Sequence, residues 1–115
     1  MGASHRRKGA NGEREAAAAL RAQGICVTRQ ARNGVDGSAD LAGDGIVCEV
    51  KRRNGGLTSA RWLEQSCAAR VNADDVAILL QREDQGAWLL TLTLADLQAF
   101  CALVSRHKCE LLSDA

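Results

Sequence analysis

Two acidic residues, Asp40 and Glu49, flank an Asp44-Gly45 dipeptide at equal distance from it. Asp-Gly is a strong signal for a two-residue hairpin turn. Counting outward from this turn places Asp40 opposite Glu49, with their Cβ atoms about 4.5–5.5 Å apart on one face. Side chains alternate along a strand, so Lys51 lies on the same face as Glu49. The intervening pairs would be Gly43 with Ile46, Ala42 with Val47, and Leu41 with Cys48.

Two carboxylates and a lysine on one face can hold a metal ion and act on a phosphate. Like charges that face each other destabilise a sheet, and charges are almost never buried unless they are paired or bind a metal. A hard divalent cation such as Mg²⁺ takes carboxylate oxygens and removes the repulsion, while Lys51 can position a water. The alternative is a surface hairpin in which Lys51 only pairs with Glu49 or Asp40. The apolar residues around Asp40, Glu49 and Lys51 argue against this surface hairpin.

A third carboxylate, Glu13, lies at the start of a run rich in strong helix formers. At helical spacing Glu13 shares the apolar side of that run with Ala16, Ala17 and Leu20. An acidic residue in a first turn also simply suits the helix dipole. Taken together with the hairpin, Glu13 becomes a candidate third ligand of the metal.

The elements that must position these residues follow from propensity, alternation and turn signals. They occur in the order αβββαββα, which predicts an α/β protein with a central mixed sheet flanked by helices. We expect one domain over residues 1–115, with 1–10 as a flexible basic arm and 93–115 as a C-terminal helical extension. The predicted helices are 12–23, 59–71 and 93–106, and the predicted strands are 25–29, 39–43, 45–52, 76–81 and 87–92. On the last helix, one side would carry Leu94, Leu97, Cys101 and Val104.

Charge is unevenly distributed along the chain. Residues 1–35 hold seven basic and two acidic side chains, whereas residues 36–115 hold eight basic and twelve acidic ones. A one-sided basic region is the usual footprint of a polyanion-binding surface, although a solvated basic terminus would look the same. No apolar run approaches the roughly 20 residues of a membrane span, and the polar start is unlike a secretory signal. The five scattered cysteines fit reduced thiols. We therefore expect a soluble cytoplasmic protein.

The spacing Asp40-x8-Glu49-Val50-Lys51 resembles the motif of the PD-(D/E)xK nuclease superfamily, here without the proline that often precedes the aspartate. The segment 7–15, RKGANGERE, resembles the opening of archaeal and phage Holliday junction resolvases. In those proteins a helix, a glycine and a short strand ending in arginine follow, as Gly24 and Arg29 do here. The resemblance covers residues 7–92 and implies a restriction-endonuclease-like core.

The resemblance also implies a reaction. It makes Asp40 and Glu49 ligands of Mg²⁺ or Mn²⁺, with Glu13 assisting directly or through water, and Lys51 the residue that serves the nucleophile. Arg14 and Arg29 match positions that contact phosphates near the cleaved bond. Relatives act as homodimers that cut two opposed strands of a four-way junction in DNA recombination and repair, in bacterial, archaeal or phage-infected cells. No organic cofactor is implied.

Further residues are candidates for contact with DNA or with the site. Arg52 and Arg53 flank the site, Gln65 could approach it from the second helix, and Trp62 could stack on a base or belong to the core. The predicted DNA-binding set is Lys8, Arg14, Arg29, Arg32, Arg52 and Arg53.

Three hypotheses of function remain. The first is a junction-resolving endonuclease that recognises branched DNA by shape. The second is another nuclease on the same scaffold, of flap, nicking or restriction type. The third is a DNA-binding module that keeps the fold without cutting, against which the intact set of carboxylates and lysine weighs.

Overall fold

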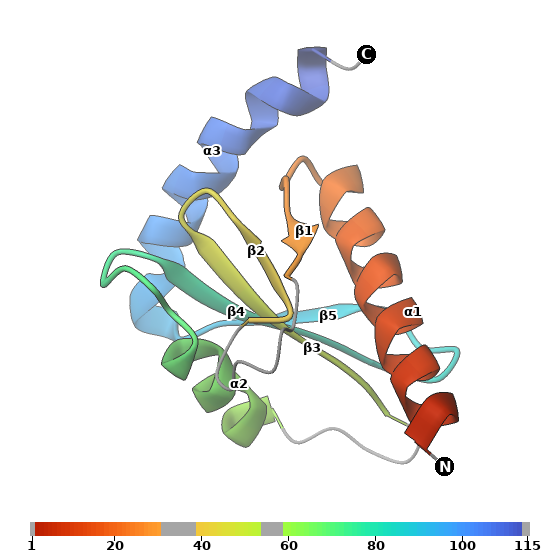
Figure 1. The fold of residues 1–115 in the computed structure, drawn as a ribbon. Coiled ribbons are helices and arrows are strands. Elements are labelled where there is room, and N and C mark those ends of the chain that lie inside the picture. The colour runs from red at the N-terminus through yellow and green to blue at the C-terminus, as the bar shows by residue number, and fades with distance from the viewer. Residues whose placement is uncertain (1, 31–38, 54–58, 114–115) are drawn as a thin grey trace.

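The computed structural model describes residues 2–30, 39–53 and 59–113, with side chains for 10–30, 39–53 and 59–107. The predicted order αβββαββα is confirmed, with a short 3₁₀ turn added before the last helix. The elements, labelled in Figure 1, are α1 (Gly2–Ala22), β1 (Thr28–Arg29), β2 (Leu41–Gly43), β3 (Ile46–Arg53), α2 (Ser59–Ala68), β4 (Val76–Glu83), β5 (Leu89–Thr91), η1 (Leu94–Asp96) and α3 (Leu97–Ser113). No helix among the described residues is both long enough and apolar enough to cross a membrane.

The strands form one mixed sheet, as the sequence predicts, and their order in it is β1-β2-β3-β4-β5. Only β3 and β4 run parallel, and α2 makes the crossover between them. The neighbouring pairs β1–β2, β2–β3 and β4–β5 are antiparallel. This topology places the longest strands, β3 and β4, side by side within the sheet, and the segment that carries Glu49 and Lys51 is paired along its length with β4.

The predicted register of the first hairpin is confirmed. Leu41 pairs with Cys48, and the turn falls at Asp44-Gly45, where Gly45 has a φ of +79°. Glycine adopts this left-handed conformation without steric cost. Gly43 is required for a second reason, because a Cβ atom there would collide with the carbonyl oxygen of Cys26.

The sheet is covered by different helices on its two faces (Figure 1). One apolar layer joins Leu20 of α1 and Leu103 of α3 to strand residues such as Cys48 and Ile78. The smaller layer on the opposite face joins Val47 and Ala77 to Ala69, which directly follows α2. Since side chains alternate along a strand, Glu49 and Lys51 share the α2 face with Val47.

The first helix begins earlier than predicted. Residues 2–10, which we expected to form a flexible arm, belong to α1. The segment contains arginine, lysine and alanine, which are strong helix formers, and no proline to stop the helix. Gly12, which we took as the start, instead lies inside α1, where it packs next to the side chain of Arg52 on β3.

The predicted apolar side of the last helix is wrong. Leu94 is 81% and Leu97 45% exposed, whereas Leu103 and His107 are buried. Leu94 lies in the 3₁₀ turn η1 and not in the helix, and of the four predicted residues only Val104 packs against the core. The core-facing series becomes Phe100, Leu103, Val104 and His107, at spacings of i, i+3, i+4 and i+7.

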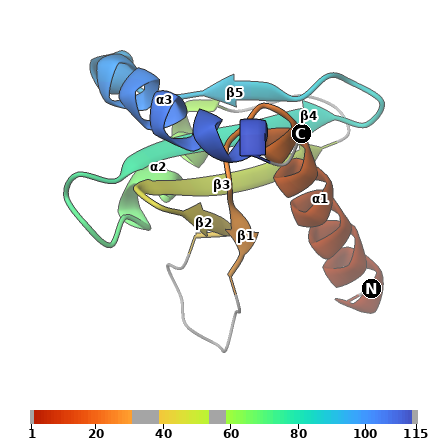
Figure 2. The same ribbon diagram turned by 90° about the horizontal axis from the view of Figure 1, so that it is seen from above.

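His107 joins α3 to the first hairpin, and both views show these turns of α3 near the β2–β3 turn (Figures 1 and 2). Its Nδ1 accepts the N–H of Cys26 at 3.1 Å, so its proton lies on Nε2, which donates to the carbonyl oxygen of Asp44 at 3.1 Å. His107 therefore satisfies one buried donor and one acceptor of segments far apart in the sequence.

We expect His107→Leu to lower the free energy of unfolding by about 1–3 kcal/mol, because both backbone groups lose their partner. Urea denaturation measures this, with Ser105→Ala on the exposed side of α3 as the matched control. A leucine variant as stable as the control would show that the two hydrogen bonds contribute nothing net.

Candidate active site

Asp40, Glu49 and Lys51 lie on the α2 side of the sheet, as the alternation of β3 predicts. Asp40 is 2% exposed, and the side chains of Glu49 and Lys51 are 13% and 19% exposed. Three ionisable groups so far from water are unusual on a sheet, because burying a charge is costly unless it has a partner.

The carboxylate of Asp40 is fixed by the backbone of the next strand. Its Oδ2 accepts the N–H of Val50 at 2.9 Å, and its own carbonyl oxygen accepts the N–H of Gln30 at 3.1 Å. The paired residues of the hairpin end at Leu41 and Cys48, one step short of the predicted Asp40–Glu49 pair. Asp40 therefore lies just outside β2, and its side chain takes up a backbone donor of β3 beyond the end of that pairing.

Lys51 and Glu49 form an ion pair, with Nζ 3.6 Å from Oε1. This contact agrees with the alternative in which Lys51 only neutralises a carboxylate. The burial of the two side chains does not agree with that alternative, because surface ion pairs of that kind are solvated and contribute little to stability. A mostly buried pair is a weak source of stability, since desolvation offsets the attraction between the charges.

The neighbouring Cys48 points to the opposite, apolar layer. Burial raises the pKa of its thiol to about 12, and the nearby Glu49 charge acts in the same direction. The thiol is therefore protonated at neutral pH and is not a nucleophile.

Glu13 is 8% exposed and bonds to Arg29, with Oε1 3.0 Å from Nε. It reaches this position from α1, which covers the other face of the sheet. Among the described residues no group of three or more His, Cys, Asp or Glu side chains is arranged to hold a metal ion. Thus the structure brings Asp40, Glu49 and Lys51 to one side of the sheet and places Glu13 with Arg29 of β1.

The predicted DNA-binding residues separate into different environments. Arg14 and Arg29 line one open pocket between α1 and β1. Arg53 is exposed, and its guanidinium lies 5.5 Å from the centre of the Trp62 ring on α2. Gln65 is exposed on α2. Arg32 and the side chain of Lys8 lie outside the described residues.

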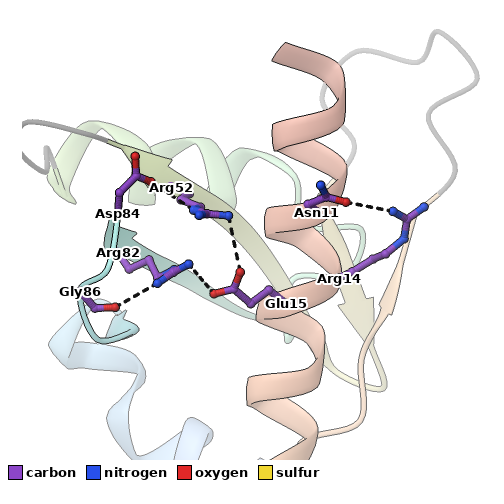
Figure 3. A network of polar contacts seen from close by, with 7 residues as sticks. All are labelled: Asn11, Arg14, Glu15, Arg52, Arg82, Asp84 and Gly86. Carbon is purple, nitrogen blue, oxygen red and sulfur yellow. Dashed lines mark hydrogen bonds and ion pairs between the residues drawn. The ribbon is translucent and has the colours of Figure 1, made fainter. Parts of the chain in front are cut away.

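Arg52 is held in a network of ion pairs that joins α1 to β3 and β4 (Figure 3). Its guanidinium lies 3.6 Å from Glu15 and 3.2 Å from Asp84, and Arg82 lies 2.7 Å from Glu15. The charge of Arg52 is therefore already paired, which the sequence alone did not indicate.

Sequence reasoning missed Gln81, which is 2% exposed on β4 and stands beside Lys51 in the parallel register. Its Nε2 donates to Ser59 at the start of α2, at 2.6 Å, and to Thr91 of β5, at 3.3 Å. Gln81 ties three elements together next to the candidate site. A polar residue directly after the apolar run 76–80 was the available signal.

Comparison with known proteins places this geometry in context. No protein-family model and no curated protein matches the chain. Among solved structures, the chain is similar to Hjc of Archaeoglobus fulgidus, a Holliday junction resolvase from an archaeal hyperthermophile. The two share 26% sequence identity with a TM-score of 0.58, over 72% of this chain and 75% of that one. The resemblance identified from the sequence is thereby confirmed: the chain has a resolvase-like α/β nuclease fold.

Proposed function

We propose that this chain is a metal-dependent endonuclease that cleaves branched DNA, and that its substrate is the four-way junction. The observation that carries the proposal is the group of Asp40, Glu49 and Lys51, held together on the sheet with their side chains largely removed from water. The similarity to a Holliday junction resolvase supports it. Folding gains little from such a group, whereas phosphodiester hydrolysis needs this combination of anions and a cation.

The donor set fits a hard divalent cation. Asp40 and Glu49 offer carboxylate oxygens, which Mg²⁺ and Mn²⁺ prefer, whereas Glu13, which is bonded to Arg29, is assigned no direct ligand role in this proposal. When bound, the ion would stabilise negative charge on the attacking and leaving oxygens.

The chain's own residues have separate tasks in the proposed reaction. A water oxygen bonds to phosphorus, the bond to the 3′ oxygen breaks, and the products carry a 5′-phosphate and a 3′-hydroxyl. Lys51, beside Glu49 at 3.6 Å, orients the water and offsets charge on the phosphate. The N–H of Val50 keeps the Asp40 carboxylate in one orientation. Glu13 holds Arg29 through Nε, so that the terminal N–H groups of Arg29 can donate to a phosphate oxygen.

Symmetric cutting of two opposed strands needs two such sites in fixed relation. We therefore propose a homodimer with a twofold axis, because a twofold dimer presents identical sites to the two halves of a junction.

We expect the wild type with Mg²⁺ to make paired, symmetric cuts in a labelled four-way junction, and EDTA to abolish them. Lys51→Ala should lower the single-turnover rate by about 100-fold or more, since one preorganised group that offsets transition-state charge contributes roughly that much. Arg61→Ala, an exposed change on α2, is the control. A flap, a duplex and a single strand are tested separately as alternative substrates.

Cutting of the duplex or flap with the junction spared would replace the resolvase proposal by another nuclease activity. Tight junction binding without any cutting would instead identify a DNA-binding module on a nuclease fold. A monomer in size-exclusion chromatography with DNA bound would contradict the paired-site proposal.

Metal binding can be tested without DNA. We expect Mn²⁺ to raise the thermal midpoint of the wild type, because a ligand that binds only the folded state stabilises it by about 2.7 kcal/mol at 100 times its Kd. Asp40→Asn should abolish that rise, yet its amide oxygen can still accept the Val50 N–H. Asp74→Asn, an exposed change, is the control. An equal Mn²⁺ effect in both variants would exclude Asp40 as a ligand.

A further inference from the structure

A basic groove runs along one side of α1 beside the short strand β1. Arg14 and Arg21 of α1 and Arg29 of β1 line one pocket of this groove, with the small side chains of Ala17 and Ala18 between them. An adjoining pocket shares Arg21 and Thr28 and continues toward the end of β2. None of the described residues that line either pocket is acidic.

Arg21 was not among the DNA-binding residues expected from the sequence, and its geometry sets it apart. It is exposed, and its Nε donates to the carbonyl oxygen of Val27 at 3.2 Å. This bond holds the side chain across the gap between α1 and the segment before β1. Within the part of the chain that the structure describes, Arg21 has no carboxylate partner.

Arg14 resembles Arg21 in this respect. Its Nη1 contacts only the side-chain oxygen of Asn11, at 3.4 Å, and no ion pair involves it among the described residues. Figure 3 shows Arg14 on the side of α1 away from Glu15, which faces the arginines of β3 and β4. The charge on this side of α1 is therefore not neutralised by the network on the other.

The spacing suits a sugar-phosphate backbone. Arg14 and Arg21 are two helical turns apart, about 10 Å along the helix axis. In a duplex each strand advances about 3.4 Å per nucleotide along the helix axis, so with α1 lying along that axis this distance corresponds to roughly three nucleotide steps. Arg29, which contacts Glu13, marks the end of the groove nearest the candidate site.

We propose that this groove binds the phosphate backbone of one DNA strand, and that Arg21 contacts a phosphate several nucleotides from the cleaved bond. The proposal rests on the nuclease function proposed above and deepens it by assigning a path for a DNA arm along α1. Arg21 then contributes to affinity and not to the chemical step, whereas Arg29 lies next to that step.

The test is binding of a labelled four-way junction and a labelled duplex, measured by fluorescence anisotropy in EDTA and in Ca²⁺ over a range of salt. Arg21→Gln should weaken binding about threefold to tenfold at about 100 mM salt, and should lower the slope of log K against log salt by about one. Its single-turnover cleavage rate at saturating enzyme should equal that of the wild type.

Arg70→Gln is the matched control. Arg70 is also exposed, and its Nε also donates to a backbone carbonyl oxygen, that of Cys67, at 3.2 Å. It lies beyond the end of α2, on the opposite face of the sheet from α1. The two variants therefore lose the same charge and the same kind of hydrogen bond at different places.

The outcomes separate this inference from the proposed function. Wild-type affinity for Arg21→Gln, an equal loss in Arg70→Gln, or no DNA binding by the wild type would each overturn the groove assignment. Normal DNA binding that depends on Arg21, without any cutting in Mg²⁺, would contradict the nuclease proposal and support the groove.

Discussion

The alignment of β2 with β3 is the constraint on which the rest of the site depends. A shift of one residue moves every side chain of a strand to the opposite face, and would carry Glu49 and Lys51 into the apolar layer beneath α1 and α3. Two features oppose such a shift. Gly43 has no room for a side chain against Cys26, and His107 holds the carbonyl oxygen at the turn. The distant helix α3 thus helps to keep the candidate site on the correct face.

The site itself works against stability. Lys51 and Glu49 are largely removed from water, and the attraction between them is offset by desolvation. A pair of apolar residues would serve the fold at least as well. The charges lie on β3 beyond its last pair with β2, where Gln81 of β4 continues the polar surroundings and is itself bonded to α2 and β5. The apolar residues of β3 and β4 stabilise the sheet, and this stability offsets the cost of holding Glu49, Lys51 and Gln81 in place.

Much of the fold and part of the candidate site could be predicted from the sequence, because the signals were local. The Asp44-Gly45 turn determined the hairpin register, and alternation then placed Glu49 and Lys51 on one face. Contacts between distant segments could not be predicted. Nothing in the sequence linked Glu13 to Arg29, and Arg52 looked like an exposed cation until α1 brought Glu15 beside it. The core-facing side of α3 was missed because the predicted side was counted from Leu94, which lies in the 3₁₀ turn before the helix.

The basic N-terminal region takes on a more specific meaning once α1 is folded. Neighbouring residues on a helix point about 100° apart, so Glu15 and Arg14 face different surroundings although they are adjacent in sequence. Glu15 neutralises Arg52 and Arg82 of the sheet, which binds α1 to β3 and β4. Arg14 and Arg21 face the groove beside β1. A nearly neutral chain can therefore present a positive surface, because its acidic residues are used to hold the helix that carries the arginines.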